Sequence, residues 1–151
     1  ENDPTQNVIS GSKAAVERAI DMAKGKGAKR ALPLPVSAPF HCALMQPAAD
    51  EMAKALAEVT LADPSLPLVA NVLAAGVATA DPIAQLLVDQ VTGRVRWRSS
   101  VEWMVEQGVT EFWEIGAGKA LSGMIRRIHK DAVLRNVGVA ADAIAAMEPA
   151  S

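Results

Sequence analysis

The sequence predicts an α/β fold, and three observations lead to that class. Short apolar segments at 66–72 and 112–115 have the length and composition of buried strands. Segments with helical spacing of apolar residues flank both of them, an alternation that favours a parallel sheet. Of the 151 residues, 50% are hydrophobic and 21% are charged, a composition that suits a packed core and excludes an intrinsically disordered chain.

The first 36 residues are expected to form a β-α-β segment. An extended run at 8–9 leads to a helix that opens at 10–12 and stops at Gly25. Residues 28–36 alternate well enough for a strand, but the two prolines in that segment cannot donate ladder hydrogen bonds. The segment is therefore either an edge strand or an extended linker.

The middle of the chain alternates helix, strand and helix. The segment from Met45 to Val59 carries one apolar helical stripe, and a buried strand over 66–72 follows it. Asp81 is expected to cap the next helix, with Pro82 at its first position and Gly93 just after its end.

The last third of the chain repeats this alternation. Ser99 and Glu102 have the spacing of a capping box, for a helix that stops at Gly108. A strand over 112–115 then leads through a glycine turn at 116–118 into another helix. The apolar face of that helix consists of Leu121, Met124, Ile125 and Ile128. A short strand candidate and an alanine-rich helix complete the tail.

Composition also excludes several classes of protein. The 15 Lys and Arg side chains stand against 17 Asp and Glu, a net charge of −2, whereas a dedicated nucleic-acid binder carries a basic excess. The longest apolar stretch, at 66–80, is interrupted by Asn71 and is too short to span a bilayer. A single cysteine, Cys42, supplies no disulfide framework and no metal cluster. We expect a soluble, cytoplasmic protein.

The glycine turn at 116–118 invites a nucleotide-binding interpretation, which the spacing does not support. A dinucleotide fingerprint requires a third glycine where Leu121 stands, and a phosphate-binding P-loop requires glycine at Trp113 and Ser or Thr at Ala120. A tight strand-to-helix turn is the favoured interpretation, and an unrelated nucleotide-binding domain is the weakest of the functional hypotheses.

His41 is a candidate general base. It lies in a loop two residues after Pro39, between the proline-broken segment and the long helix, and loop residues between rigid elements often carry catalysis. A structural histidine is the open alternative. The neighbouring Cys42 is expected to be a packed cysteine, because adjacent side chains diverge and a Cys–His dyad is therefore not expected.

Two clusters of basic residues each have two possible interpretations, a solvated surface or a docking site. The first gathers four cations in seven residues, and it contains Lys24, Lys26, Lys29 and Arg30. Such a group is either a solvated helix end or a docking patch for an acidic partner. The second surrounds His129 near a helix end, where cations complement the helix dipole.

The chain resembles the malonyl-CoA:acyl-carrier-protein transacylases and the acyltransferase domains of polyketide and fatty-acid synthases. The resemblance keeps order and spacing from residue 1 to about residue 139. The matching segments are 2–6 (NDPTQ), 8–11 (VISG), 28–37 (AKRALPLPVS), 38–45 (APFHCALM), 71–72, Gln90, 95–97 (VRW), 100–102 (SVE), 107–109 (QGV) and 114–119 (EIGAGK).

The resemblance implies a fold and its division. Residues 1–36 would form the second part of a small ferredoxin-like subdomain, and residues 37–151 the C-terminal part of an α/β-hydrolase-like parallel sheet domain. The family's nucleophile lies in a G-x-S-x-G elbow, and this sequence has no such motif. The chain therefore resembles only the C-terminal portion of the family, and the serine would belong to an N-terminal half.

The resemblance also implies roles for individual residues. His41 falls on the catalytic histidine, and Gln90 on the residue whose backbone carbonyl orients it. Phe40 and Asn71 fall on substrate-binding positions, where the bulk of Phe40 would favour malonyl over methylmalonyl. The cluster of Lys24, Lys26, Lys29 and Arg30 would dock the acyl carrier protein.

The implied reaction is ping-pong transfer of malonyl from coenzyme A to the phosphopantetheine thiol of the carrier, in fatty-acid or polyketide synthesis. It needs no cofactor and no metal, since malonyl-CoA and the carrier are substrates. The alternative is a carrier-docking or regulatory module that lacks the nucleophile.

Overall fold

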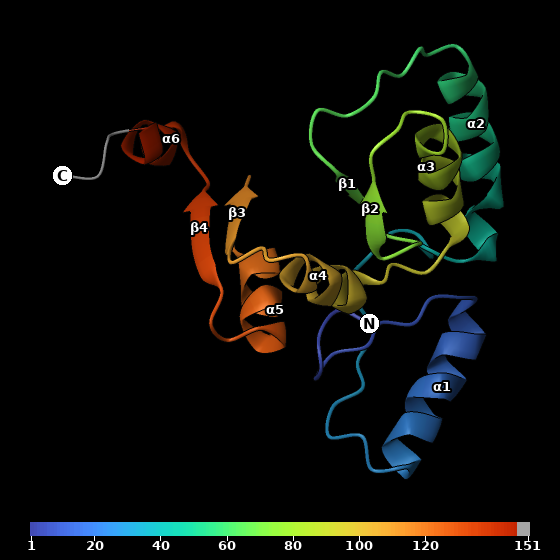
Figure 1. The fold of residues 1–151 in the computed structure, drawn as a ribbon. Coiled ribbons are helices and arrows are strands. Elements are labelled where there is room, and N and C mark those ends of the chain that lie inside the picture. Colours follow the sequence, from blue (N-terminus) through green and yellow to red (C-terminus); the bar gives the residue numbers. More distant parts are fainter. Residues whose placement is uncertain (148–151) are drawn as a thin grey trace. The chain divides into compact units, whose positions relative to one another are not determined.

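The computed structural model describes residues 1–147, and its contacts divide the chain into two units. One unit contains residues 8–95, and the other combines residues 1–7 with the chain from Arg96 onward. Figure 1 shows the helices and strands in chain order. The α/β class expected from the sequence is confirmed, while the expected division into domains at 1–36 and 37–151 stays a prediction.

The unit of residues 8–95 begins with the expected helix. Helix α1 spans Lys13–Gly25, and the following residues 28–36 are extended without pairing to another strand. The extended-linker alternative therefore describes this segment, and the expected strand at 8–9 is wrong for the same reason. A short 3-10 helix, Ala43–Met45, leads directly into α2, Gln46–Ala57.

Strand β1, Leu68–Ala70, pairs with β2, Ala75–Val77, and the pair is antiparallel. The parallel arrangement expected for the 66–72 segment is wrong, because a four-residue connection allows only a hairpin. Ala74 adopts a positive φ of 55° to close the turn, and its backbone N donates to the Ala70 carbonyl at 2.8 Å.

Helix α3, Ile83–Thr92, covers this hairpin and forms the core of the unit with it. The core side chains are Ala70, Val77 and Ile83, with Leu61, Leu86 and Leu87 packed against them. Pro82 occupies the N-cap position and no side chain caps the helix, so the capping role expected for Asp81 is wrong. The predicted end before Gly93 is confirmed.

The second unit contains a parallel strand pair, and two of its helices pack on one face of that pair. It comprises α4 (Trp97–Glu106), β3 (Glu111–Ile115), α5 (Ala120–Ile128), β4 (Val133–Val137) and α6 (Ala140–Met147). Strand β3 pairs with β4 in parallel, from Glu111 opposite Val133 to Ile115 opposite Val137. The inner face buries Phe112 against Val101 and Ile125.

The outer face of the same strand pair is apolar and exposed. Trp113, Ile115 and Val133 alternate with the buried residues and lie on this face, and Ile115 is 76% exposed. Arg135 and Glu111 pair across it, with 2.9 Å between Nε and Oε1. Exposed apolar patches of this kind commonly mark contact surfaces.

A carboxylate from strand β3 caps helix α5. Glu114 accepts hydrogen bonds from the backbone N of Leu121 at 3.0 Å and of Ser122 at 2.7 Å. The Ser122 hydroxyl also donates to it, and these bonds hold the pKa of the Glu114 carboxyl below its ordinary value. The N–H groups that would cradle a phosphate are therefore already bound, which agrees with a plain strand-to-helix turn at 116–118.

The expected capping box at the start of α4 is wrong. Ser99 lies inside the helix, whose N-cap is Arg96 without a side-chain cap. The hydroxyl of Ser100 donates to the Arg96 carbonyl at 3.0 Å.

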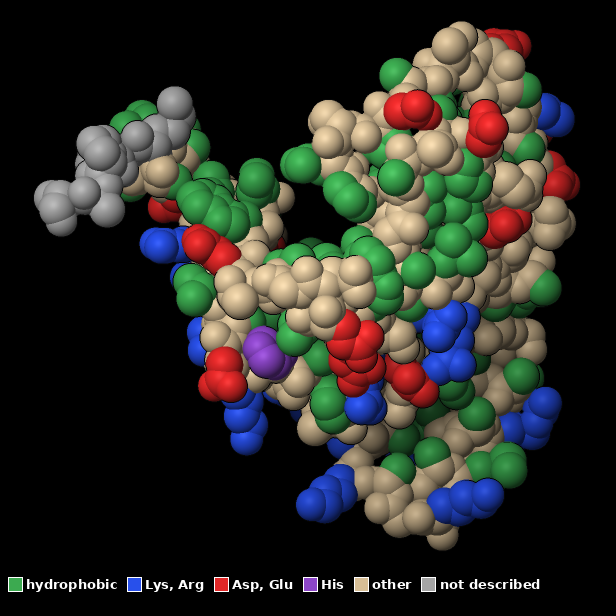
Figure 2. Space-filling model, in the orientation of Figure 1, with side chains coloured by type: hydrophobic (Ala, Val, Ile, Leu, Met, Phe, Trp, Pro, Cys, Tyr) green, Lys and Arg blue, Asp and Glu red, His purple; other side chains and the backbone are tan. Residues whose placement is uncertain are grey.

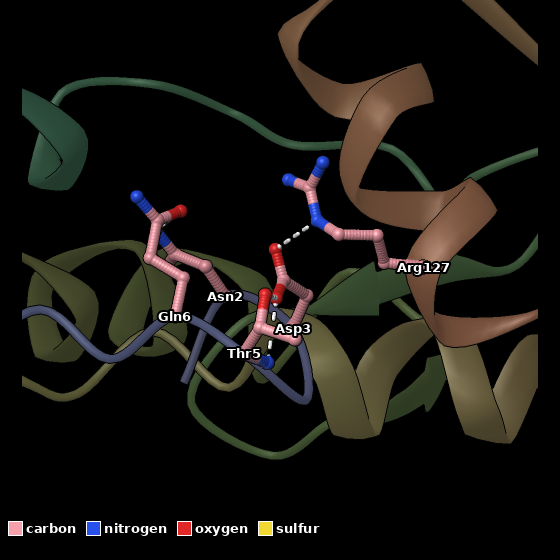
Figure 3. Close-up of polar contacts among 5 residues, drawn as sticks. All are labelled: Asn2, Asp3, Thr5, Gln6 and Arg127. Atoms are coloured by element: carbon pink, nitrogen blue, oxygen red, sulfur yellow. Dashed lines mark hydrogen bonds and ion pairs between the residues drawn. The ribbon is translucent and has the colours of Figure 1, made fainter. Parts of the chain in front are cut away.

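Residues 1–7 are fixed to α5 by a buried carboxylate (Figure 3). Asp3 accepts hydrogen bonds from the backbone N and the hydroxyl of Thr5 at 2.8 and 2.7 Å. Arg127 donates to its other oxygen at 2.8 Å. The Asp3 side chain is fully buried, and Arg127 is about half exposed.

Among residues 1–147, no helix combines the length and the apolar character that crossing a membrane requires.

Candidate active site around His41

The site is built on the loop that carries His41, between the extended segment and the 3-10 helix. His41 has a φ of 59°, a left-handed conformation that few residues other than glycine adopt. Strained backbone of this kind is concentrated at functional sites. The side chain of His41 is exposed. The ring is therefore not buried in the core, and its role as a general base stays a prediction.

The imidazole is held by the main chain of α3. His41 Nδ1 lies 2.8 Å from the carbonyl oxygen of Gln90. A carbonyl only accepts hydrogen bonds, so this contact requires the proton on Nδ1 and leaves the lone pair of Nε2 free. The ring is thereby set in the tautomer that can take up a proton at Nε2.

The position of Gln90 in its helix explains why this carbonyl is available. The chain turns to an extended conformation at Gly93, with φ −84° and ψ 158°. The last bond of the helical ladder therefore runs from Gly93 N to Asp89 O, at 2.7 Å. Carbonyls in the last turn lack intrahelical donors, and they form the partially negative end of the helix dipole.

Asn71 joins the same cluster through the side chain of Gln90. Asn71 Nδ2 donates to Gln90 Oε1 at 2.9 Å. Asn71 follows strand β1 directly, so a polar turn residue of the hairpin meets the last turn of α3. His41, Gln90 and Asn71 therefore form one chain of hydrogen bonds, and the structure brings together three of the predicted site residues.

A cavity of about 200 Å³ lies beside this cluster. Its walls are apolar side chains of β1 and α3, with Asn71 and Gln90 as the amide-bearing residues. The lining residues are Leu68, Val69, Ala70, Asn71, Ile83, Leu86, Leu87 and Gln90. Apolar walls with a few polar groups are typical of small-molecule binding sites.

The residues that flank His41 differ in exposure. Phe40 is 46% exposed, so its ring is available to a bound molecule. Cys42 is half-buried, and its thiol donates to the Pro39 carbonyl at 3.1 Å. This contact fits the packed cysteine expected from the sequence.

The predicted docking residues lie at and after the end of α1. Lys24 is in the last turn of the helix, and Lys26, Lys29 and Arg30 follow it. All four side chains are exposed. Figure 2 shows Lys and Arg side chains around the region of α1. In the described part of the chain, the hydrogen bonds of the His41 ring and of the Gln90 side chain go to other residues and not to these four cations.

His129 is less solvated than expected. It is half-buried and lines a groove of about 190 Å³ together with Glu102, Val105, Glu106 and Ile128. Within residues 1–147, no group of three or more His, Cys, Asp and Glu side chains could hold a metal ion.

The sequence does not reveal the role of two further residues, one in each unit. Gly93 is expected only as a stop signal, although it packs closely against Val72. The spacing of Glu114 from Leu121 and Ser122 does not by itself indicate a cap.

Comparisons with known proteins agree on one family. No family model matches the chain. The malonyl CoA-acyl carrier protein transacylase of Escherichia coli (strain K12) is 51% identical over 127 residues, which cover 84% of this chain and 41% of that protein. The transacylase of Bacillus subtilis (strain 168) is 41% identical over 129 residues, covering 85% and 41%.

Solved structures give the same result. An acyl-carrier-protein-S-malonyltransferase from Bartonella henselae is 52% identical with a TM-score of 0.85, covering 91% of this chain and 44% of that one. The transacylase of Streptococcus pneumoniae is 43% identical with a TM-score of 0.90, covering 96% and 47%. The chain spans less than half the length of the curated relatives it matches. In sequence and in fold, it therefore corresponds to a C-terminal portion of the malonyl CoA-acyl carrier protein transacylase family.

Proposed function

We propose that this chain contributes the general base of an acyltransferase that moves a malonyl group from coenzyme A to the phosphopantetheine thiol of acyl carrier protein. The observation that carries the proposal is the 2.8 Å contact between His41 Nδ1 and the Gln90 carbonyl. It fixes the tautomer and leaves Nε2 as the basic nitrogen, as proton relay requires.

The proposed mechanism has two half-reactions. His41 Nε2 takes the proton from a serine hydroxyl, the serine oxygen bonds to the malonyl carbonyl carbon, and the bond to the coenzyme A sulfur breaks. Nε2 then protonates the leaving thiolate. In the second half, Nε2 takes the proton from the carrier's thiol, whose sulfur attacks the acyl-serine, and the proton returns to the serine oxygen. The serine belongs to the N-terminal half of the family pattern.

The names of similar proteins support the choice of substrates. The relatives named above are malonyl CoA-acyl carrier protein transacylases. A malonyl-transacylase that is 45% identical, with a TM-score of 0.84, was solved in complex with a type II PKS acyl-carrier protein. The family's chemistry suits fatty-acid or polyketide synthesis. The cytoplasmic location and the independence from any cofactor stay predictions.

The proposal is tested by acyl transfer in the full-length protein that carries this chain. Malonyl-CoA alone should add one malonyl group to the protein, detected by intact mass, and carrier protein bearing phosphopantetheine should remove it. Carrier without phosphopantetheine has no thiol and should leave the malonyl group in place. Carrier binding without any malonyl-protein would instead favour the docking or regulatory module, and absence of both would overturn the proposal.

We further propose that the exposed cations after α1 dock the carrier. Replacing Lys24, Lys26, Lys29 and Arg30 by alanine should raise the KM for carrier about tenfold at low salt, because charge complementarity speeds association. The effect should shrink as salt screens the charges. Lys13→Ala, an exposed cation at the start of α1, is the matched control. An unchanged KM for carrier in the fourfold variant would assign the cluster to a solvated surface.

We propose that Phe40 limits the size of the acyl group that the site accepts. Its half-exposed ring precedes His41, where bulk would crowd an α-methyl substituent. Phe40→Ser should therefore raise kcat/KM for methylmalonyl-CoA relative to malonyl-CoA by about tenfold, the usual worth of one methyl group in a pocket. An unaltered ratio of the two kcat/KM values would remove Phe40 from the specificity pocket.

A further inference from the structure

The turn after β1 meets the last turn of α3 at two points. At the first, Asn71 Nδ2 donates to Gln90 Oε1 at 2.9 Å. At the second, the backbone of Gly93 packs against the side chain of Val72. The two contacts lie on either side of the position at which the helix ends. Together they fix the segment that carries the Gln90 carbonyl.

Position 93 requires glycine because there is no room for a Cβ atom, and not because of its backbone angles. Its φ of −84° and ψ of 158° are accessible to any residue. A Cβ atom at this position would lie 2.6 Å from the carbonyl oxygen of Asp89 and 3.0 Å from Cγ1 of Val72. The Asp89 oxygen is backbone and also accepts the last ladder bond, from Gly93 N. Relief of that clash therefore has to move the end of the helix.

We infer that Asn71 and Gly93 are positioning residues for the proposed general base. They hold the last turn of α3 so that the Gln90 carbonyl lies within hydrogen-bond distance of His41 Nδ1. Neither residue touches the reacting atoms in this scheme. Both act through the carbonyl, and the carbonyl acts through the imidazole.

This assignment rests on the proposed function and differs from what the family resemblance implies for Asn71. The resemblance places Asn71 among substrate-binding residues. In the structure, its amide nitrogen is engaged by the side chain of Gln90. A misplacement of about 1 Å in a catalytic group costs on the order of 100-fold in rate, so loss of either contact is expected to lower kcat.

The first test is a double-mutant cycle in the full-length protein. Asn71→Ala and Gln90→Ala each keep the backbone carbonyl and each remove the same side-chain contact. Each should lower kcat by about tenfold, with the KM for malonyl-CoA unchanged, and the double variant should be no worse than either single variant. Asn71→Asp should rescue most of the loss, since the Gln90 amide can reverse and donate to the carboxylate.

Multiplied losses in the double variant would show that the two side chains act separately. A raised KM with normal kcat would return Asn71 to substrate binding. Either result would overturn the inference without touching the proposed function.

The second test uses Gly93→Ala, with Gly11→Ala as its matched control. Gly11 lies in the same unit, and a Cβ there meets nothing within 4 Å. Gly93→Ala should lower kcat by at least tenfold, whereas Gly11→Ala should leave it unchanged.

The imidazole itself supplies a readout that does not depend on activity. The ¹⁵N chemical shifts of His41 should report the Nδ1–H tautomer in the wild type and a mixture of tautomers in Gly93→Ala. An unaltered tautomer in that variant would overturn the inference, even if the protein transferred no malonyl group. If the wild-type protein transferred no malonyl group while the tautomer of His41 changed in Gly93→Ala as expected, the result would count against the proposed function alone.

Discussion

His41→Ala in the full-length protein should lower kcat for malonyl transfer by about 1,000-fold, the usual contribution of a positioned general base. The serine hydroxyl and the carrier's thiol would both have to lose their protons to water. The KM for malonyl-CoA should change little, because the imidazole acts on the reacting proton and not on binding. Steady-state kinetics with a carrier that bears phosphopantetheine measures both parameters.

His129→Ala is the control for this experiment. It removes the other histidine of the chain, which lies in the second unit beside Glu102 and Glu106. Its turnover should match that of the wild type. Near-normal turnover of His41→Ala would exclude His41 as the base, and equal losses in both variants would indicate a general loss of folded protein.

Asp3→Ala should destabilise the unit that contains α5 by about 2 kcal/mol, because it removes two hydrogen bonds from Thr5 and one from Arg127. The estimate is modest since Arg127 is half exposed and returns to water. Urea unfolding measures the total loss, and hydrogen exchange of residues 1–7 and α5 locates it. Asp131→Ala, an exposed carboxylate of the same unit, should change neither.

The same carboxylate makes the stability of this unit depend on pH. Burial raises the pKa of Asp3, but the hydrogen bonds from Thr5 and the contact with Arg127 outweigh it, so the pKa lies below the ordinary value of an aspartate. The stabilisation is therefore complete above the ordinary pKa of an unfolded aspartate and is lost as the pH falls through the lower folded value. In that acidic range, the free energy of unfolding of the wild type should approach that of Asp3→Ala. A difference between the two free energies that stays constant at all pH values would contradict this account.

Most helices could be predicted from the sequence because local signals fix them. The stripe from Met45 to Val59 and the stop at Gly93 depend on neighbours within one or two turns. The parallel pairing of β3 with β4 could also be predicted, since a helix connects the two strands. The hairpin of β1 and β2 could not, because Asn71 is the one usual turn residue in the connection, and the position at positive φ holds Ala74 instead of glycine.

Helix caps were predicted less well than helix bodies. Asp81 and Ser99 have suitable side chains and spacing, yet neither caps a helix here. The cap of α5 comes instead from Glu114 on a strand. Such a cap depends on how the strand packs beside the helix, which spacing along the chain does not reveal.

The candidate site was predictable in its residues and not in its contacts. Pro39 and the loop position drew attention to His41, and family resemblance drew attention to Gln90. The contact between Asn71 and Gln90 joins residues 19 positions apart. The contact of Gly93 with Val72 depends on the geometry of the hairpin turn.

The group that orients the imidazole belongs to the main chain, and this changes which mutations the segment can tolerate. No substitution at position 90 can delete a peptide oxygen. Inserting or deleting one residue between Ile83 and Gly93, however, would rotate that oxygen by roughly 100° about the axis of α3. Over evolutionary time, alignments of this stretch should therefore show no gaps, even where its exposed side chains differ.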